Sequence, residues 1–69
     1  MTEGQMARDF LLHHAAQRFC DACLMLRLRR TDFAAVQREA LALAAEEDFR
    51  REAAHCSDCG QTRATTMAM

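Results

Sequence analysis

The sequence predicts a mainly α-helical α+β fold, with three short helices followed by a β-hairpin that carries a metal-binding turn. Apolar residues recur at three- and four-residue spacing over the first two thirds of the chain, as they do on one face of a helix. The last third is rich in threonine, which favours strands. Two Cys-x-x-Cys pairs bracket the third predicted helix. With 69 residues, we expect one domain over 1–69, too small to be stable by packing alone.

The first predicted helix covers residues 5–19 and the second covers residues 20–29. The first has a stripe of residues at helical spacing, made of Met6, Phe10, Leu11, His14 and Ala15. In the second, the leucines at 24, 26 and 28 also alternate as they would in a strand. A helix is favoured there because the segment contains five residues of high helix propensity, Ala22, Leu24, Met25, Leu26 and Arg27.

The third predicted helix covers residues 32–47. Thr31 is a suitable N-cap, and Asp32 places negative charge at the positive end of the helix dipole. One apolar stripe then follows along the helix, formed by Phe33, Val36, Ala40, Leu43 and Ala44. The acidic run 46–48 is unfavourable at the negative end of the dipole, so the helix is expected to end there.

The predicted hairpin covers residues 50–67. The segment 50–55 pairs with 62–67, and the Cys56 to Gly60 segment forms the turn. Gly60 permits the positive φ that such a turn needs.

Composition argues for a soluble cytoplasmic protein with no membrane association. The N-terminal segment 1–10 contains charged residues and lacks the apolar core of a secretory signal. No segment approaches the roughly 18 consecutive apolar residues of a membrane span. Net charge is −1, and all nine basic residues are arginine. A near-neutral chain has no overall electrostatic attraction for nucleic acid.

The four cysteines predict one structural Zn²⁺ ion per chain, bound by Cys20, Cys23, Cys56 and Cys59. Each Cys-x-x-Cys pair can direct two thiolates to one tetrahedral ion. Thiols stay reduced in the cytoplasm, which disfavours the alternative of two disulfides. A redox pair of the thioredoxin type would need a βαβ unit that the chain lacks. Iron accepts the same ligands, so ligand identity leaves zinc and iron both open.

The chain is not expected to be an enzyme or to bind a small-molecule substrate. Four thiolates leave no coordination position open for a substrate. The sequence also contains no arguable Ser-His-Asp or Cys-His-Asn set.

Two segments lie on either side of the Thr31-capped helix, namely Phe19-Cys20-Asp21-Ala22-Cys23-Leu24 and Cys56-Ser57-Asp58-Cys59-Gly60. In this arrangement the chain resembles small bacterial zinc-containing winged-helix proteins. The similarity extends from about Ala7 to Met67 and lies in the layout. It implies a winged helix-turn-helix-like fold whose hairpin is the wing, and double-stranded DNA as the partner. The helix from Asp32 would then read bases with Gln37 and Arg38. Phosphates would be contacted by Arg29, Arg30, Arg50, Arg51 and Arg63.

The alternative function is a zinc-stapled module that binds another protein or a second copy of itself, without binding DNA. The near-neutral charge favours it. So does the alanine-rich third helix, because small side chains allow close helix packing.

Overall fold

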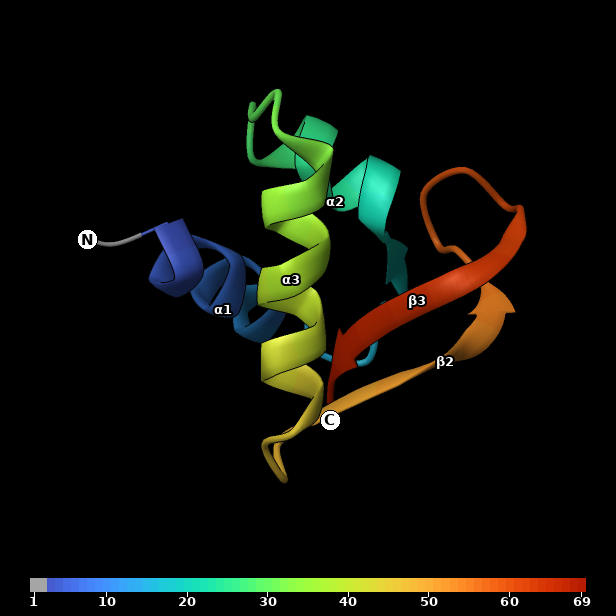
Figure 1. The fold of residues 1–69 in the computed structure, drawn as a ribbon. Helices are drawn as coiled ribbons and strands as arrows, with labels where there is room; N and C mark the ends of the chain where they lie inside the picture. The colour runs from blue at the N-terminus through green and yellow to red at the C-terminus, as the bar shows by residue number, and fades with distance from the viewer. Residues whose placement is uncertain (1–2) are drawn as a thin grey trace.

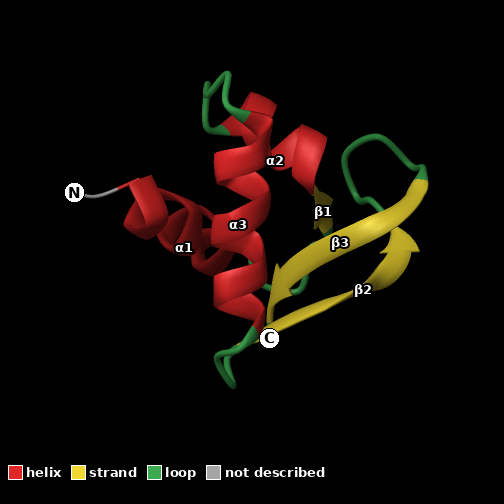
Figure 2. Ribbon diagram, viewed as in Figure 1, coloured by secondary structure: helices red, strands yellow, loops and turns green. Residues whose placement is uncertain are grey.

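Three helices and a three-stranded antiparallel sheet make up the fold (Figure 1). The computed structural model describes residues 3–69, and their side chains from residue 5 onward. In chain order the elements are α1 (Glu3–His13), β1 (Phe19–Cys20), α2 (Asp21–Arg27), α3 (Phe33–Ala44), β2 (Phe49–His55) and β3 (Thr62–Ala68). The α+β prediction is confirmed. Figure 2 shows the helices gathered on one side and the hairpin extending away from them.

Both N-terminal helices are shorter than the sequence predicts. The first ends at His13 rather than residue 19, because Ala16 adopts a φ of 69° and turns the chain toward β1. The second ends at Arg27 rather than residue 29. There Arg29 takes a φ of 56°, and the amides of Arg29 and Arg30 bond back to the carbonyls of Leu26 and Met25. This is the Schellman arrangement that ends a helix, with arginine in the position usually held by glycine.

The third helix begins one residue later than predicted and ends three residues earlier. Asp32 is the N-cap in place of Thr31, and its carboxylate accepts a hydrogen bond of 3.1 Å from the Ala35 amide. The helix ends at Ala44, and residues 45–48 form a turn. Val36, Ala40 and Leu43 are buried as predicted. Phe33 was expected in the same stripe but is 45% exposed.

The predicted hairpin is confirmed, and the sheet has one strand more. β2 pairs with β3 from Phe49 opposite Ala68 to His55 opposite Thr62. The two residues of β1 pair with Thr66 and Thr65 of β3, giving the strand order β1-β3-β2. β1 therefore joins the start of α2 to the hairpin.

A small core lies between the helices and the sheet. α3 packs against α1, α2 and β2, and α1 also contacts β3. The buried cluster consists of Ala7, Leu11, Phe19, Leu24, Val36, Ala40, Leu43, Phe49 and Ala68. Within residues 3–69, none of the helices combines the length and apolar character needed to traverse a bilayer.

Candidate metal centre

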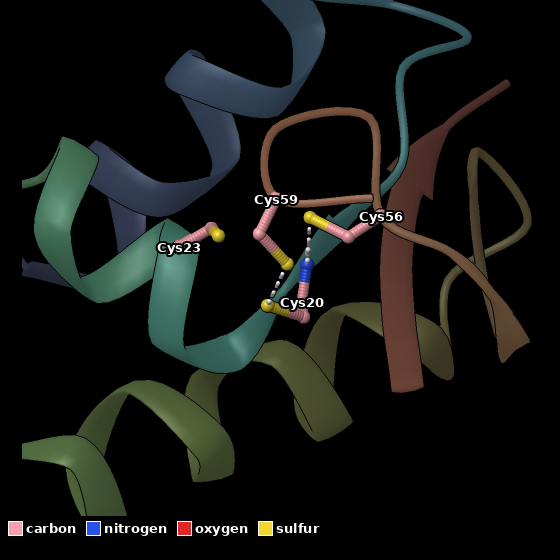
Figure 3. A group of neighbouring side chains, drawn as sticks. All are labelled: Cys20, Cys23, Cys56 and Cys59. Carbon is pink, nitrogen blue, oxygen red and sulfur yellow. Dashed lines mark hydrogen bonds between the residues drawn. The ribbon is translucent and has the colours of Figure 1, made fainter. Parts of the chain in front are cut away.

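The fold brings the four cysteines together (Figure 3). Cys20 ends β1 and Cys23 lies in the first turn of α2. Cys56 and Cys59 belong to the turn between β2 and β3, here called the cysteine turn (residues 56–60). The four Sγ atoms all lie within 4.8 Å of one another. Cys59 is exposed and the other three are buried.

The spacing of the sulfurs suits one tetrahedral metal ion. Metal–sulfur bonds of about 2.3 Å place neighbouring sulfurs about 3.8 Å apart in a tetrahedron. The Sγ atoms of Cys20 and Cys59 are 3.9 Å apart. The cluster also joins distant parts of the fold, because two of its cysteines come from the β1–α2 junction and two from the hairpin. A bound ion would therefore tie these two parts of the chain together.

Backbone geometry in the cysteine turn directs amides toward sulfur. Gly60 has a φ of 76° and donates its amide hydrogen to the carbonyl of Cys56 over 2.9 Å. The amides of Asp58 and Cys20 each donate to Sγ of Cys56 over 3.4 Å. Such N–H donors stabilise negative charge on sulfur.

The thiols differ in how readily they ionise. Burial raises the pKa of the Cys20 and Cys23 thiols above the usual value. Burial also opposes ionisation of Cys56, but backbone hydrogen bonds from Cys20, Cys59 and Asp58 outweigh it and lower the pKa of Cys56 to about 6. Cys56 is thus more readily available as a thiolate, the form that binds a metal, than Cys20 or Cys23.

Polar contacts hold the cysteine turn against the rest of the fold. Ser57 donates its amide to the carbonyl of Arg18 over 2.7 Å, and its hydroxyl accepts from the Arg18 amide over 3.0 Å. Arg27 of α2 makes a bidentate contact with the Asp58 carboxylate, at 3.1 and 2.6 Å. The Arg27 hydrogen bonds lower the pKa of Asp58. The turn is therefore attached both to Arg18, the residue before β1, and to α2.

A buried ion pair supports the first cysteine pair. Asp21 lies between Cys20 and Cys23, and its two carboxylate oxygens accept hydrogen bonds of 2.8 and 2.7 Å from Arg51 of β2. The side chains of Arg51 and Asp21 are only 12% and 7% exposed. Arg51 also donates to the hydroxyl of Thr66 over 2.9 Å. No role for Asp21 was predicted from the sequence, although its place between the two cysteines of the first pair was a signal.

The residues predicted to contact DNA lie on several elements, and two of them are in ion pairs. Arg51 is not available to contact a phosphate, because its guanidinium is buried in the ion pair with Asp21. Arg30 pairs with Glu39, and these side chains are only 10% and 19% exposed. Arg63 donates to the Gln61 side chain. The exposed members lie at four places, with Arg29 before α3, Gln37 and Arg38 on α3, Arg50 on β2 and Arg63 on β3.

No protein-family model, curated protein or solved structure gives a significant match to this chain. Its function therefore has to be inferred from its own residues.

Proposed function

We propose that this protein is a zinc-stapled protein-interaction module whose binding surface is the outward face of α3. The observation that carries the proposal is the exposure of large apolar side chains on this helix. Leu41, on this outward face, is 53% exposed, and Phe33, in the first turn of the same helix but to the side of this face, is 45% exposed. Exposed apolar side chains on an uncovered helix are available for contact with a partner protein.

The outward face of α3 follows from its buried face. Val36, Ala40 and Leu43 point into the core. At about 100° per residue, the opposite face contains Ala34, Arg38, Leu41 and Ala45, all of which are exposed. In Figure 1 no other element lies in front of α3. This face has a single charge and two alanines, which let another backbone approach closely, as helix packing requires.

The metal in this proposal is one Zn²⁺ ion with a structural role. Four thiolates complete its tetrahedral coordination, and the ion would fix the hairpin to the β1–α2 junction. α3 lies between these two parts in the chain, so the ion would also close the loop that contains α3. Elemental analysis of the reduced purified protein should find about one zinc per chain. Finding iron in the same amount instead would mean that the structural ion bound by the four cysteines is iron.

Site-specific crosslinking tests the interaction surface. A photo-reactive benzoylphenylalanine replaces Leu41 on α3, and in a control chain it replaces Leu12, an exposed leucine on α1. In cells producing the protein, we expect a crosslinked adduct from position 41 and none from position 12. Equal labelling at both positions, or none at 41, would reject α3 as the binding surface.

Double-stranded DNA is the second candidate partner. The arrangement of α2, a short turn, α3 and a hairpin has the element order that the winged-helix resemblance implies, and Gln37 and Arg38 are exposed on α3. The net charge of −1 disfavours DNA, as does the use of Arg30 and Arg51 in internal ion pairs.

A DNA titration separates the two candidates. If α3 enters a major groove, Arg38→Ala should weaken binding to a preferred sequence by about 1 to 3 kcal/mol. Arg50→Ala should weaken all sequences alike and lower the salt dependence, as loss of a phosphate contact does. Absence of salt-dependent binding to duplex DNA would leave the interaction module as the function.

A further inference from the structure

We propose that the four-cysteine cluster is also a site of oxidation, at which a hydroperoxide reacts with Cys59 and a disulfide between Cys20 and Cys59 replaces the metal ion. The inference rests on the structural ion proposed above and not on the partner of α3. Two observations carry it. Cys59 is the exposed thiol of the cluster, and its sulfur lies beside that of Cys20, which belongs to the other Cys-x-x-Cys pair.

Exposure decides which thiol an oxidant dissolved in water reaches. Cys59 lies in the turn of the hairpin and is exposed, whereas the other three cysteines are at most 7% exposed. The residues on either side of it, Asp58 and Gly60, are exposed as well. A small polar oxidant such as hydrogen peroxide can therefore reach Cys59 in the folded protein. Oxidation of cysteine is selective for exposed thiolates, the form in which a metal ligand is held.

The chemistry has two steps. The Cys59 thiolate attacks one oxygen of hydrogen peroxide, the O–O bond breaks, and hydroxide leaves, so that Cys59 becomes a sulfenic acid. The Cys20 thiolate then attacks the Cys59 sulfur, the S–O bond breaks, and a second hydroxide leaves. The two thiolates together lose two electrons to the peroxide, and the product is one disulfide.

Cys20 is the thiol placed to complete the second step. Its Sγ lies 3.9 Å from Sγ of Cys59 (Figure 3). A disulfide bond of about 2 Å then requires a shift of about 2 Å, which is within the reach of side-chain rotation in an exposed turn. Cys56 lies in the same turn as Cys59, but the amides of Asp58 and Cys20 donate to its Sγ and hold it in place.

The disulfide would exchange one cross-link for another. It uses two of the four ligands, and the two thiolates that remain do not complete a tetrahedral site, so the metal is released. Cys20 and Cys59 are 39 residues apart and join the β1–α2 junction to the hairpin, the same two parts that the ion would tie together. Closing this loop covalently restricts the unfolded chain. The oxidised chain should therefore lose its metal and keep its fold.

Peroxide treatment of the zinc-loaded full chain tests the proposal. Zinc release is followed with a chromophoric chelator too weak to remove zinc from the untreated protein, and disulfides are mapped after trypsin digestion without reductant. Trypsin cleaves after arginine, which places Cys20 and Cys23 in one peptide and Cys56 and Cys59 in another. With about one equivalent of peroxide we expect release of about one zinc and formation of about one disulfide per reacted chain, between the two peptides and at Cys20 and Cys59. Disulfides confined within each peptide would overturn the proposal.

Two variants test the roles of the thiols. In Cys20→Ser the second step is blocked, so the sulfenic acid at Cys59 should persist and react with dimedone. Cys23→Ser is the matched control, because it removes another buried ligand and keeps both reacting thiols. It should form the disulfide and give no dimedone adduct. An adduct at a different cysteine in Cys20→Ser would reject Cys59 as the reacting thiol, and the map of the native chain does not depend on either variant.

Circular dichroism tests whether the disulfide takes the place of the ion. The oxidised, zinc-free chain should keep its helical signal, and reductant added together with chelator should abolish it. Loss of the helical signal on oxidation would overturn the exchange of cross-links. The two proposals also fail in different ways. A reduced purified chain without metal would reject the structural ion, whereas a zinc-loaded chain that keeps its zinc after peroxide treatment would reject only the oxidation site.

Discussion

Asp21 and Arg51 illustrate how much one buried contact contributes at the scale of the residue. Each side chain would be an unpaired buried charge without the other. In the pair, Arg51 donates hydrogen bonds to both carboxylate oxygens of Asp21. Removing one partner of such a pair costs about 3 to 5 kcal/mol, because the remaining charge stays buried and unpaired. Arg51 keeps 12% of its side chain exposed, which places the expected cost near the lower end of that range.

We therefore predict that Arg51→Ala lowers the free energy of unfolding by about 3 kcal/mol. The matched control is Arg50→Ala, one position earlier on β2, where the side chain is exposed and the expected change is within about 0.5 kcal/mol. Urea unfolding of the metal-loaded proteins measures both. Equal effects of the two substitutions would mean that the Asp21 pair contributes nothing specific to stability.

Sites formed by residues at local spacing can be predicted from the sequence. Contacts that depend on the register of the strands cannot. The cysteine cluster follows from two Cys-x-x-Cys pairs, each of which is local. The partner of Asp21 lies 30 residues further along the chain and is chosen by the position of β2 in the sheet. Neighbouring arginines at 50 and 51 look alike in the sequence, yet one is exposed and the other is paired with Asp21.

At the scale of the element, α3 depends on how its N-terminus is capped. The carboxylate of Asp32 accepts from the Ala35 amide, whereas Thr31 lies one residue outside the cap. Asp32→Ala should lower the free energy of unfolding by about 1 kcal/mol through loss of this hydrogen bond. Thr31→Ala should have little effect. A larger loss for Thr31→Ala in thermal or urea unfolding would assign the cap to the threonine after all.

Element boundaries were the least predictable feature of the fold, for two physical reasons. β1 has only two residues, too few for any periodic pattern, and it exists because β3 offers Thr65 and Thr66 as partners. α1 and α2 end where Ala16 and Arg29 adopt positive φ. Neither residue type favours that conformation, so tertiary contacts rather than local preference end these helices. The hairpin was predictable because both of its strands are long and Gly60 marks its turn.

At the scale of the whole molecule, two separate clusters hold the fold together. The apolar core has nine buried residues, four of them alanine or valine, so it buries little volume for a chain of this length. The second cluster consists of Cys20, Cys23 and Cys56, with Ala22 packed against it. It lies where the hairpin meets the β1–α2 junction. Without a metal, this junction would depend on the pairing of β1 with β3, on the Asp21–Arg51 pair and on the contacts of Arg18 and Arg27 with the cysteine turn.

Removal of the metal is therefore predicted to unfold the protein. In small metal-stapled domains, the binding free energy of the ion, on the order of 10 kcal/mol, is largely folding free energy. Treating the reduced protein with excess chelator should abolish most of the helical circular dichroism, and stoichiometric zinc should restore it. Acidification should have the same effect, because the thiolates must then bind protons in place of the metal. Helical signal and Tm that survive complete metal removal would show that the nine-residue core is sufficient by itself.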